Sequence, residues 1–245
     1  MWLGWGAILV VFMVTAARAE SVDVAVVLAA DVSRSIDNDE FKLQRRGYAE
    51  AITNPRTLAA IRAGARGAIA LCYVEWSGPD EQRVIAPWTV IRDGESAASF
   101  AALVESAPRA FVGTTSLSAA IQYAAERFAE SGVEADRRVI DISGDGTNNS
   151  GRAIRDARDA VVKEGIIING LAIINDHPAP GFAAHTQPPE GLPAYFSANV
   201  IGGPGSFLRV MEDFAAFGEA MTSKLVGEIA LGGSREQKVF SAVLP

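Results

Sequence analysis

The stretch VDVAVVLAADVSRS, residues 22–35, decides the fold class and contains the first part of a candidate site. Residues 22–30 are apolar and rich in valine, and the run is too short for a helix, so it predicts a buried strand. The turn that follows carries a carboxylate on Asp31 and hydroxyls on Ser33 and Ser35. All three are hard oxygen ligands of the kind that Mg²⁺ prefers, although the same residue types are also common in ordinary turns.

Two more turns with oxygen-bearing side chains follow later in the chain. Residues 113–116 contain Thr115 and open a predicted helix, whereas residues 143–146 contain Asp145 and follow a predicted strand. In an open α/β sheet, ligands bind beyond the carboxyl ends of the strands, where the strand order switches. We therefore expect the three turns to meet at that edge of the sheet.

The alternation of strand-like and helix-like segments predicts an α/β fold, a three-layer, doubly wound and mostly parallel sheet with one antiparallel edge strand. Strands are expected at about residues 22–30, 67–76, 83–91, 138–143, 166–174 and 206–211. Helices are expected from the capping box Asp37–Glu40 to Asn54-Pro55, and at about residues 95–106, 115–130, 150–164 and 213–229. The turn at 77–82 is too short for a parallel crossover, so the strand after it should be the antiparallel one.

The first 19 residues are predicted to be a signal peptide. An apolar run ends there in Ala17-Arg18-Ala19, a small-residue cleavage signal. Cleavage after Ala19 would leave one domain at residues 20–230 and a loosely ordered tail at 231–245, in the periplasm or outside the cell. No Lys or Arg precedes the apolar run, so the alternative is an uncleaved anchor that holds the domain on the membrane, facing the periplasm.

Composition limits the function classes that remain. The formal net charge is -7, and the chain has no basic cluster, which argues against binding to nucleic acid. Hydrophobic residues make up 49% of the chain, enough for one sizeable core. Cys72 is the only cysteine, so no intramolecular disulfide can form, and its apolar surroundings in the sequence predict a buried thiol.

The oxygen-bearing residues make the chain resemble a von Willebrand factor A-type (vWA) domain. The metal-ion-dependent adhesion site (MIDAS) of that family uses Asp-x-Ser-x-Ser, a later Thr and a later Asp, which correspond here to Asp31, Ser33, Ser35, Thr115 and Asp145. The chain looks more similar still to a poorly characterised branch of exported bacterial proteins within that family. That branch has blocks such as Glu75-Trp76-Ser77-Gly78, Pro87-Trp88-Thr89 and Ser143-Gly144-Asp145-Gly146.

The resemblance implies a function. Ser33 and Ser35 would bind a Mg²⁺ ion directly, with Mn²⁺ and Ca²⁺ as the alternative ions, and Thr115 would bind it directly or through water. Asp31 and Asp145 would act mainly through bridging waters. One position on the ion would be filled by an Asp or Glu of a partner protein, so the resemblance implies a binding module and no reaction. Arg34 departs from the family, where a small residue is common at this place.

A hydrolase and a nucleotide-binding protein are the alternatives to a binding module. A Mg²⁺-dependent phosphoryl hydrolase that uses Asp31 is the enzymatic alternative, but that chemistry would prefer a second carboxylate where the chain has Ser33. Nucleotide binding is not favoured, because the Gly144–Asn149 turn lacks a third glycine and no phosphate-binding Gly-Lys loop is present.

The remaining polar residues are predicted to have structural roles. Asp141 is expected to be a buried or edge carboxylate with a local hydrogen-bond partner, and a metal role is the alternative. Asn148 and Asn149 are expected to cap the helix at 150–164, and lining the site is the alternative. His177 and His185 are the only histidines and fit no zinc spacing. They lie in an irregular segment, residues 175–205, which is the first candidate for partner specificity.

Overall fold

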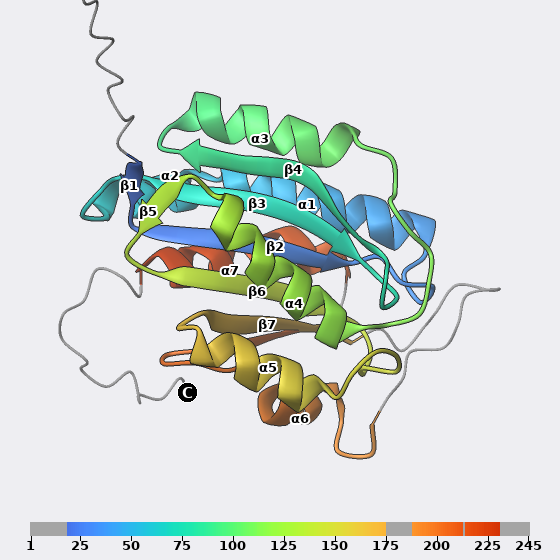
Figure 1. The fold of residues 1–245 in the computed structure, drawn as a ribbon. Coiled ribbons are helices and arrows are strands. Elements are labelled where there is room, and N and C mark those ends of the chain that lie inside the picture. Colours follow the sequence, from blue (N-terminus) through green and yellow to red (C-terminus); the bar gives the residue numbers. More distant parts are fainter. Residues whose placement is uncertain (1–18, 175–187, 213, 231–245) are drawn as a thin grey trace, which may run out of the picture.

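The computed structural model describes residues 19–174, 188–212 and 214–230. Among these residues, the centre of the molecule is a six-stranded sheet of order β4-β3-β2-β6-β7-β8 (Figure 1). Its strands are β2 (Val24–Asp31), β3 (Ile69–Trp76), β4 (Gln82–Ile91), β6 (Arg138–Gly144), β7 (Ile167–Ile173) and β8 (Leu208–Met211). Every neighbouring pair is parallel except β3 and β4, so the prediction of a mostly parallel sheet with an antiparallel edge strand is confirmed.

Strand β2 is completely buried because helices cover both of its faces. Val24, Val26 and Leu28 point into one hydrophobic core, and the alternate residues Ala25 and Val27 point into the other. The first core is covered by α1 (Asn38–Thr53), α2 (Pro55–Ala63), α3 (Gly94–Ser106) and α7 (Phe217–Ala230). The second is covered by α4 (Leu117–Arg127), α5 (Ile154–Lys163) and α6 (Leu192–Tyr195). The result is the three-layer arrangement that the sequence predicts.

Several elements differ from the prediction. Asn54-Pro55 does end α1, but it also begins α2, because the Asn54 side chain accepts a hydrogen bond from the Arg56 amide and proline is well tolerated in the first helical turn. Part of the segment at 175–205 is helical, in α6 and the π-helical turn Phe196–Val200, whereas residues 175–187, with both histidines, lie outside the described residues. The 231–245 tail also lies outside them.

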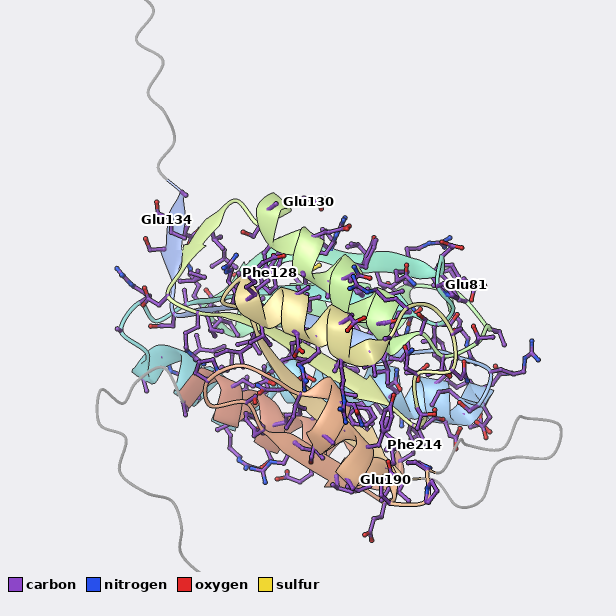
Figure 2. All side chains as sticks on the ribbon, turned by 60° about the horizontal axis from the view of Figure 1, so that its bottom comes forward. Glu81, Phe128, Glu130, Glu134, Glu190 and Phe214 are labelled. Carbon is purple, nitrogen blue, oxygen red and sulfur yellow. The ribbon has the colours of Figure 1, made fainter. Side chains whose placement is uncertain are left out.

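A small second sheet joins the start of the domain to its middle. Strand β1 (Glu20–Val22) pairs in parallel with β5 (Val133–Ala135), and neither strand was predicted, because three residues give no periodic signal. Figure 2 shows Glu134 of β5 and Glu81, just before β4, at opposite ends of the molecule. No helix in the described part of the chain is both long and apolar enough to span a bilayer.

A buried ionic cluster connects β6 to α7. The Lys224 ammonium lies 2.6 Å from Asp141 Oδ1 and 2.6 Å from Glu228 Oε1, and all three side chains are fully buried. Asn169 on β7 donates to Glu228 Oε1. Asp141 is therefore a buried carboxylate, as predicted, but its partner is a lysine from the far end of the chain.

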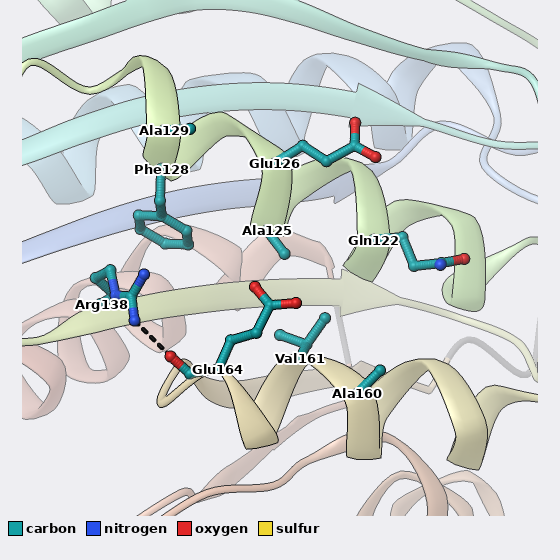
Figure 3. Close-up of a pocket in the computed structure, with 9 residues that line it drawn as sticks. All are labelled: Gln122, Ala125, Glu126, Phe128, Ala129, Arg138, Ala160, Val161 and Glu164. Atoms are coloured by element: carbon teal, nitrogen blue, oxygen red, sulfur yellow. Dashed lines mark hydrogen bonds between the residues drawn. The ribbon is translucent and has the colours of Figure 1, made fainter.

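A groove of about 340 Å³ lies between α4 and α5 (Figure 3). Arg138, at the start of β6, donates to the backbone oxygen of Glu164 beside it. Because Arg138 stands at the amino end of its strand, this groove is at the opposite edge of the sheet from the predicted site, and none of the five predicted site residues lines it.

Candidate metal centre

The switch in strand order brings the predicted turns together. Strand β2 lies between β3 and β6, and the chain runs outward from it in both directions. Asp31 is the last residue of β2, and Asp145 directly follows β6, so both carboxylates lie at the carboxyl edge of neighbouring strands. Thr115 reaches the same edge from the loop that precedes α4.

A chain of short contacts joins four of the predicted side chains. Thr115 Oγ1 donates to Ser33 Oγ at 3.4 Å, and Ser33 Oγ lies 3.2 Å from Ser35 Oγ. Ser35 Oγ in turn donates to Asp145 Oδ1 at 2.8 Å. The fifth residue, Asp31, accepts the Ser33 amide at 2.7 Å through Oδ1. All five predicted residues therefore form one cluster, here named the oxygen cluster.

The carboxylates of the oxygen cluster lie deep, and its hydroxyls lie nearer to solvent. Asp31 and Asp145 are fully buried, whereas Ser35 and Thr115 are 8% and 6% exposed. Burial raises the pKa of Asp31 well above its ordinary value, and the nearby charge of Asp145 raises it further. A neighbouring negative charge disfavours ionisation of Asp31 unless a cation offsets it.

The donor set fits a hard divalent cation. Asp31 Oδ2 is buried and has no hydrogen-bond partner in the part of the chain that the structure describes. A buried carboxylate oxygen without a partner is costly, and a bound cation or its water would satisfy it. Two carboxylates and three hydroxyls are all-oxygen ligands, as Mg²⁺, Mn²⁺ and Ca²⁺ prefer. No group of three or more His, Cys, Asp or Glu that could hold a metal occurs among the described residues. The oxygen cluster has two carboxylates, and its three hydroxyls would supply the other protein ligands.

Two asparagines hold the loop that carries Thr115. Asn149 Oδ1 accepts the Thr115 amide at 3.0 Å, and Asn148 Oδ1 accepts the Ser118 amide at 2.9 Å. The prediction that they cap the following helix is wrong, because α5 begins only at Ile154 and its N-cap residue makes no side-chain hydrogen bond. Their side-chain oxygens instead join the turn after β6 to the loop before α4 and to the first turn of α4. Sequence spacing cannot reveal such contacts between distant segments.

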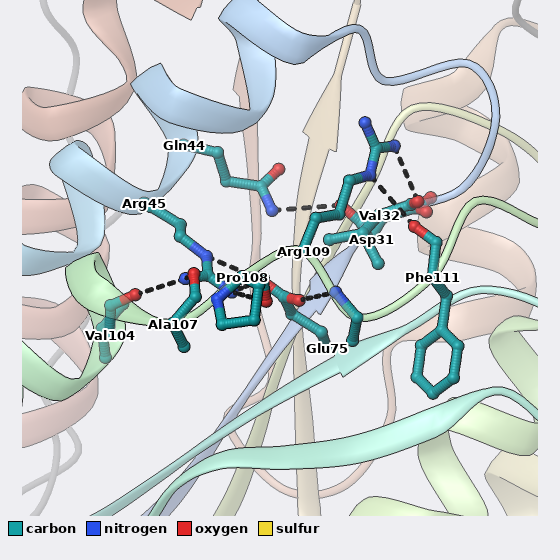
Figure 4. Close-up of polar contacts among 11 residues, drawn as sticks. Asp31, Val32, Gln44, Arg45, Glu75, Val104, Ala107, Pro108, Arg109 and Phe111 are labelled. Atoms are coloured by element: carbon teal, nitrogen blue, oxygen red, sulfur yellow. Dashed lines mark hydrogen bonds and ion pairs between the residues drawn. The ribbon is translucent and has the colours of Figure 1, made fainter.

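Polar side chains on the other side also hold the first turn of the oxygen cluster (Figure 4). Gln44 on α1 donates to the backbone oxygen of Asp31 at 3.0 Å. The Arg109 guanidinium donates to three backbone oxygens of the segment 32–36. Neither residue could be predicted from the sequence, because neither belongs to a recognisable pattern.

The other residues named in the sequence lie in the core or contact the backbone of neighbouring segments. Arg34 is exposed, and its amide donates to the Gly113 carbonyl at 2.9 Å. Trp76 is buried in the core, and Trp88 donates to the Arg127 carbonyl. Cys72 is a buried free thiol, and burial raises its pKa to about 12, which leaves it unreactive.

The fold is that of vWA-type domains. Three solved structures show the likeness. Proximal thread matrix protein 1 from the mussel byssus, with a zinc-occupied MIDAS motif, has a TM-score of 0.61 and 13% identity over 86% of this chain and 48% of its own. A von Willebrand factor type A protein from Catenulispora acidiphila has a TM-score of 0.55 and 15% identity over 88% and 44%. BatB from Bacteroides thetaiotaomicron has a TM-score of 0.55 and 18% identity over 85% and 99%.

At the level of sequence, residues 21–232 match the model of the family described as "Protein of unknown function (DUF1194)", and the chain belongs to that family. No curated protein sequence matches the chain. This chain spans about half the length of the mussel protein. The predicted resemblance to a vWA domain is confirmed, and at these identities the likeness concerns the fold.

Proposed function

We propose that this chain is a divalent-cation-dependent protein-binding module. Asp31, Ser33, Ser35, Thr115 and Asp145 would hold the ion, and an Asp or Glu carboxylate from a partner protein would complete its coordination. The observation that carries the proposal is the oxygen cluster itself. Hydrogen bonds join side chains from three separated loops, and the buried Asp31 Oδ2 has no hydrogen-bond partner among the described residues. The bound cation would supply the positive charge by which an acidic protein could attract an acidic partner.

The residues of the oxygen cluster would divide the work. Ser33, Ser35 and Thr115 offer neutral oxygens, and Ser35 and Thr115 are the most exposed of the five, where an incoming group would arrive. Asp31 and Asp145 supply negative charge from beneath. Mg²⁺ is the first candidate for the ion, because it keeps several waters and needs few protein ligands, with Mn²⁺ and Ca²⁺ as alternatives. A neighbouring fold with a zinc-occupied MIDAS motif supports a divalent ion without specifying which one.

The proposal includes a place outside the cytoplasm. The apolar segment that ends at Ala19 would direct export, with release into the periplasm or retention by an uncleaved anchor as the two outcomes. The likeness to a pilus adhesin, SpaC from Lactobacillus rhamnosus GG, supports a role at the cell surface. The alternative of a phosphoryl hydrolase gains nothing from the site, because Asp31 is fully buried and Ser33 stands in place of a second carboxylate.

Thermal unfolding in Mg²⁺, Mn²⁺ or Ca²⁺ against a chelator tests the cation. At about 100 times the dissociation constant, a cation that binds only the folded state adds about 2.7 kcal/mol to the free energy of unfolding. Asp31→Asn should abolish this gain and Ser35→Ala should reduce it, whereas Asp80→Asn, a change at an exposed residue, should leave it intact. Identical unfolding of the wild type in all three cations and in chelator would exclude the site.

A second experiment tests the partner. Immobilised wild type and Asp31→Asn are incubated with a cell-envelope extract in Mg²⁺ and in chelator. A true partner is retained only by the wild type in Mg²⁺, and free acetate or glutamate at high concentration competes with it. Retention that is the same in chelator, or the same with Asp31→Asn, contradicts the proposed mode of binding.

A further inference from the structure

The side chain of Arg109 crosses between two of the three loops that build the oxygen cluster. Arg109 lies in the loop between α3 and α4, residues 107–116, which also carries Thr115. Its Nη2 lies 2.8 Å from the Val32 carbonyl, 2.9 Å from the Ser33 carbonyl and 2.8 Å from the Ile36 carbonyl. One guanidinium nitrogen therefore contacts two carbonyls of the Asp-x-Ser-x-Ser turn and the carbonyl of the residue that follows it.

The base of Arg109 is itself held in place. Its Nε donates to the Phe111 carbonyl at 3.0 Å, within the same loop. The next residue, Ala110, donates its amide to Glu75 Oε2 at 3.0 Å, and Glu75 is fully buried at the end of β3. The loop that carries Arg109 is thus bonded to the sheet. The hydrogen bonds of its guanidinium can therefore hold the turn with Ser33 and Ser35 in one position.

The charge of Arg109 is unfavourable for a neighbouring cation. Its field acts on Asp31 and opposes the rise in that residue's pKa. A positive charge at this place interacts favourably with Glu75 but should weaken the binding of a divalent ion, so attraction to the ion gives no reason for an arginine here. The hydrogen bonds do, because a planar guanidinium can donate in several directions at once, whereas the ammonium of lysine is a point charge with a different reach.

We propose that Arg109 is a positioning residue for the cation site, which fixes the Ser33–Ser35 turn relative to the Thr115 loop before any ion binds. The inference rests on the proposed function, since it concerns the same oxygen cluster. It adds that the hydroxyl ligands are prearranged by an arginine that does not itself touch the ion. Residues that orient the ligands of a metal typically change its affinity by 10- to 100-fold when they are replaced.

Titration calorimetry with Mg²⁺ and Mn²⁺ on the full chain tests this with two Arg109 variants, one that keeps the positive charge and one that removes it. Arg109→Lys keeps the positive charge and loses the geometry, and Arg109→Gln loses both. If positioning dominates, both variants bind the ion about 10- to 100-fold more weakly than the wild type. Arg137→Gln is the matched control, because Arg137 is also half-buried and donates to two backbone oxygens, those of Glu228 and Ile229, at the other edge of the sheet.

Each outcome decides the question. Weaker binding by both Arg109 variants, with unchanged binding by Arg137→Gln, supports the proposal. Tighter binding by Arg109→Gln would mean that the charge outweighs the hydrogen bonds, and wild-type affinity in Arg109→Lys would mean that the geometry is not needed; either result overturns it. If the wild type binds no ion, it is the proposed function that fails.

A measurement on the wild type alone keeps the proposal falsifiable should the variants not fold. The Arg34 amide donates to the Gly113 carbonyl, and the Ile36 amide donates to the Ser33 carbonyl. If the turn is prearranged, both amides are protected from hydrogen exchange in chelator as well as in Mg²⁺. Protection that appears only after the cation is added would show that the ion orders the turn, and it would overturn the role given to Arg109.

Discussion

Arg45 on α1 and Glu75 on β3 form an ion pair that is almost completely removed from solvent. Arg45 Nη2 lies 2.6 Å from Glu75 Oε1, and the two side chains are 4% and 0% exposed. Arg45 also donates to the carbonyls of Val104, Ala107 and Pro108, so the pair fixes the point at which the chain leaves α3 toward the site (Figure 4).

Arg45→Met should destabilise the domain by about 3–5 kcal/mol, because it leaves the Glu75 carboxylate buried without its positive partner. The loss is measured by urea unfolding in chelator, which separates it from any effect of a cation. Arg56→Met is the control, since the Arg56–Glu219 pair has the same 2.6 Å separation but side chains that are 54% and 69% exposed. An exposed pair contributes less than about 1 kcal/mol, so equal losses at the two sites would contradict the interpretation.

The Lys224–Asp141–Glu228 cluster should make stability depend on pH. Burial, together with the charge of Glu228, raises the pKa of Asp141 from 3.8 to about 7, although the charge of Lys224 opposes the rise. A carboxyl group that holds its proton more tightly when folded contributes stability at low pH and loses it as the pH rises through its folded pKa. We expect the contribution of Asp141 to decline between about pH 4 and pH 7.

Asp141→Asn should flatten that part of the stability curve, because the amide is neutral at every pH and leaves Lys224 paired with Glu228 alone. Urea unfolding of both proteins across the pH range measures the difference, which should be on the order of a few kcal/mol. Asp80→Asn, a change at an exposed residue, should keep the wild-type slope. A variant curve parallel to that of the wild type would show that Asp141 does not titrate as expected.

Cation binding should release protons. Because burial and the charge of Asp145 raise the pKa of Asp31 in the cation-free protein, the site holds a proton at pH values where an exposed aspartate would not. A divalent ion must displace that proton, so its affinity should increase as the pH rises through the raised pKa of Asp31. Calorimetry in two buffers with different heats of ionisation counts the protons released, and identical heats in both would contradict the prediction.

The fold could be predicted from the sequence because its strands are periodic and well separated. The strand at 24–31 is buried on both faces and reads as a continuous apolar run, and the short turn at 77–82 revealed the one antiparallel pairing. The helix α2 was missed because Asn54-Pro55 ends one helix and begins another, and both uses have the same sequence. Strands β1 and β5 depend on each other across more than a hundred residues and have no local signal.

The candidate site was only partly predictable. The five members of the oxygen cluster follow from a family pattern in three parts, and each part is a short stretch of sequence. The side chains that hold the backbone of these loops, Arg109, Asn148 and Asn149, act through hydrogen bonds to backbone groups far away in the sequence, and side chains of these types occur in many surface loops. Only the folded chain shows which arginine reaches which carbonyl.

Strand β1 and the last turn of α7 lie at the same edge of the sheet, since Arg137, directly before β6, donates to the carbonyls of Glu228 and Ile229. The oxygen cluster lies at the other edge, beyond the eight residues of β2, a span of roughly 26 Å. Whatever is attached at either end of the domain, be it a lipid-embedded segment or another protein, is therefore joined at the pole facing away from the hydroxyls. A domain attached at that edge would keep its oxygen cluster on the side away from the attachment.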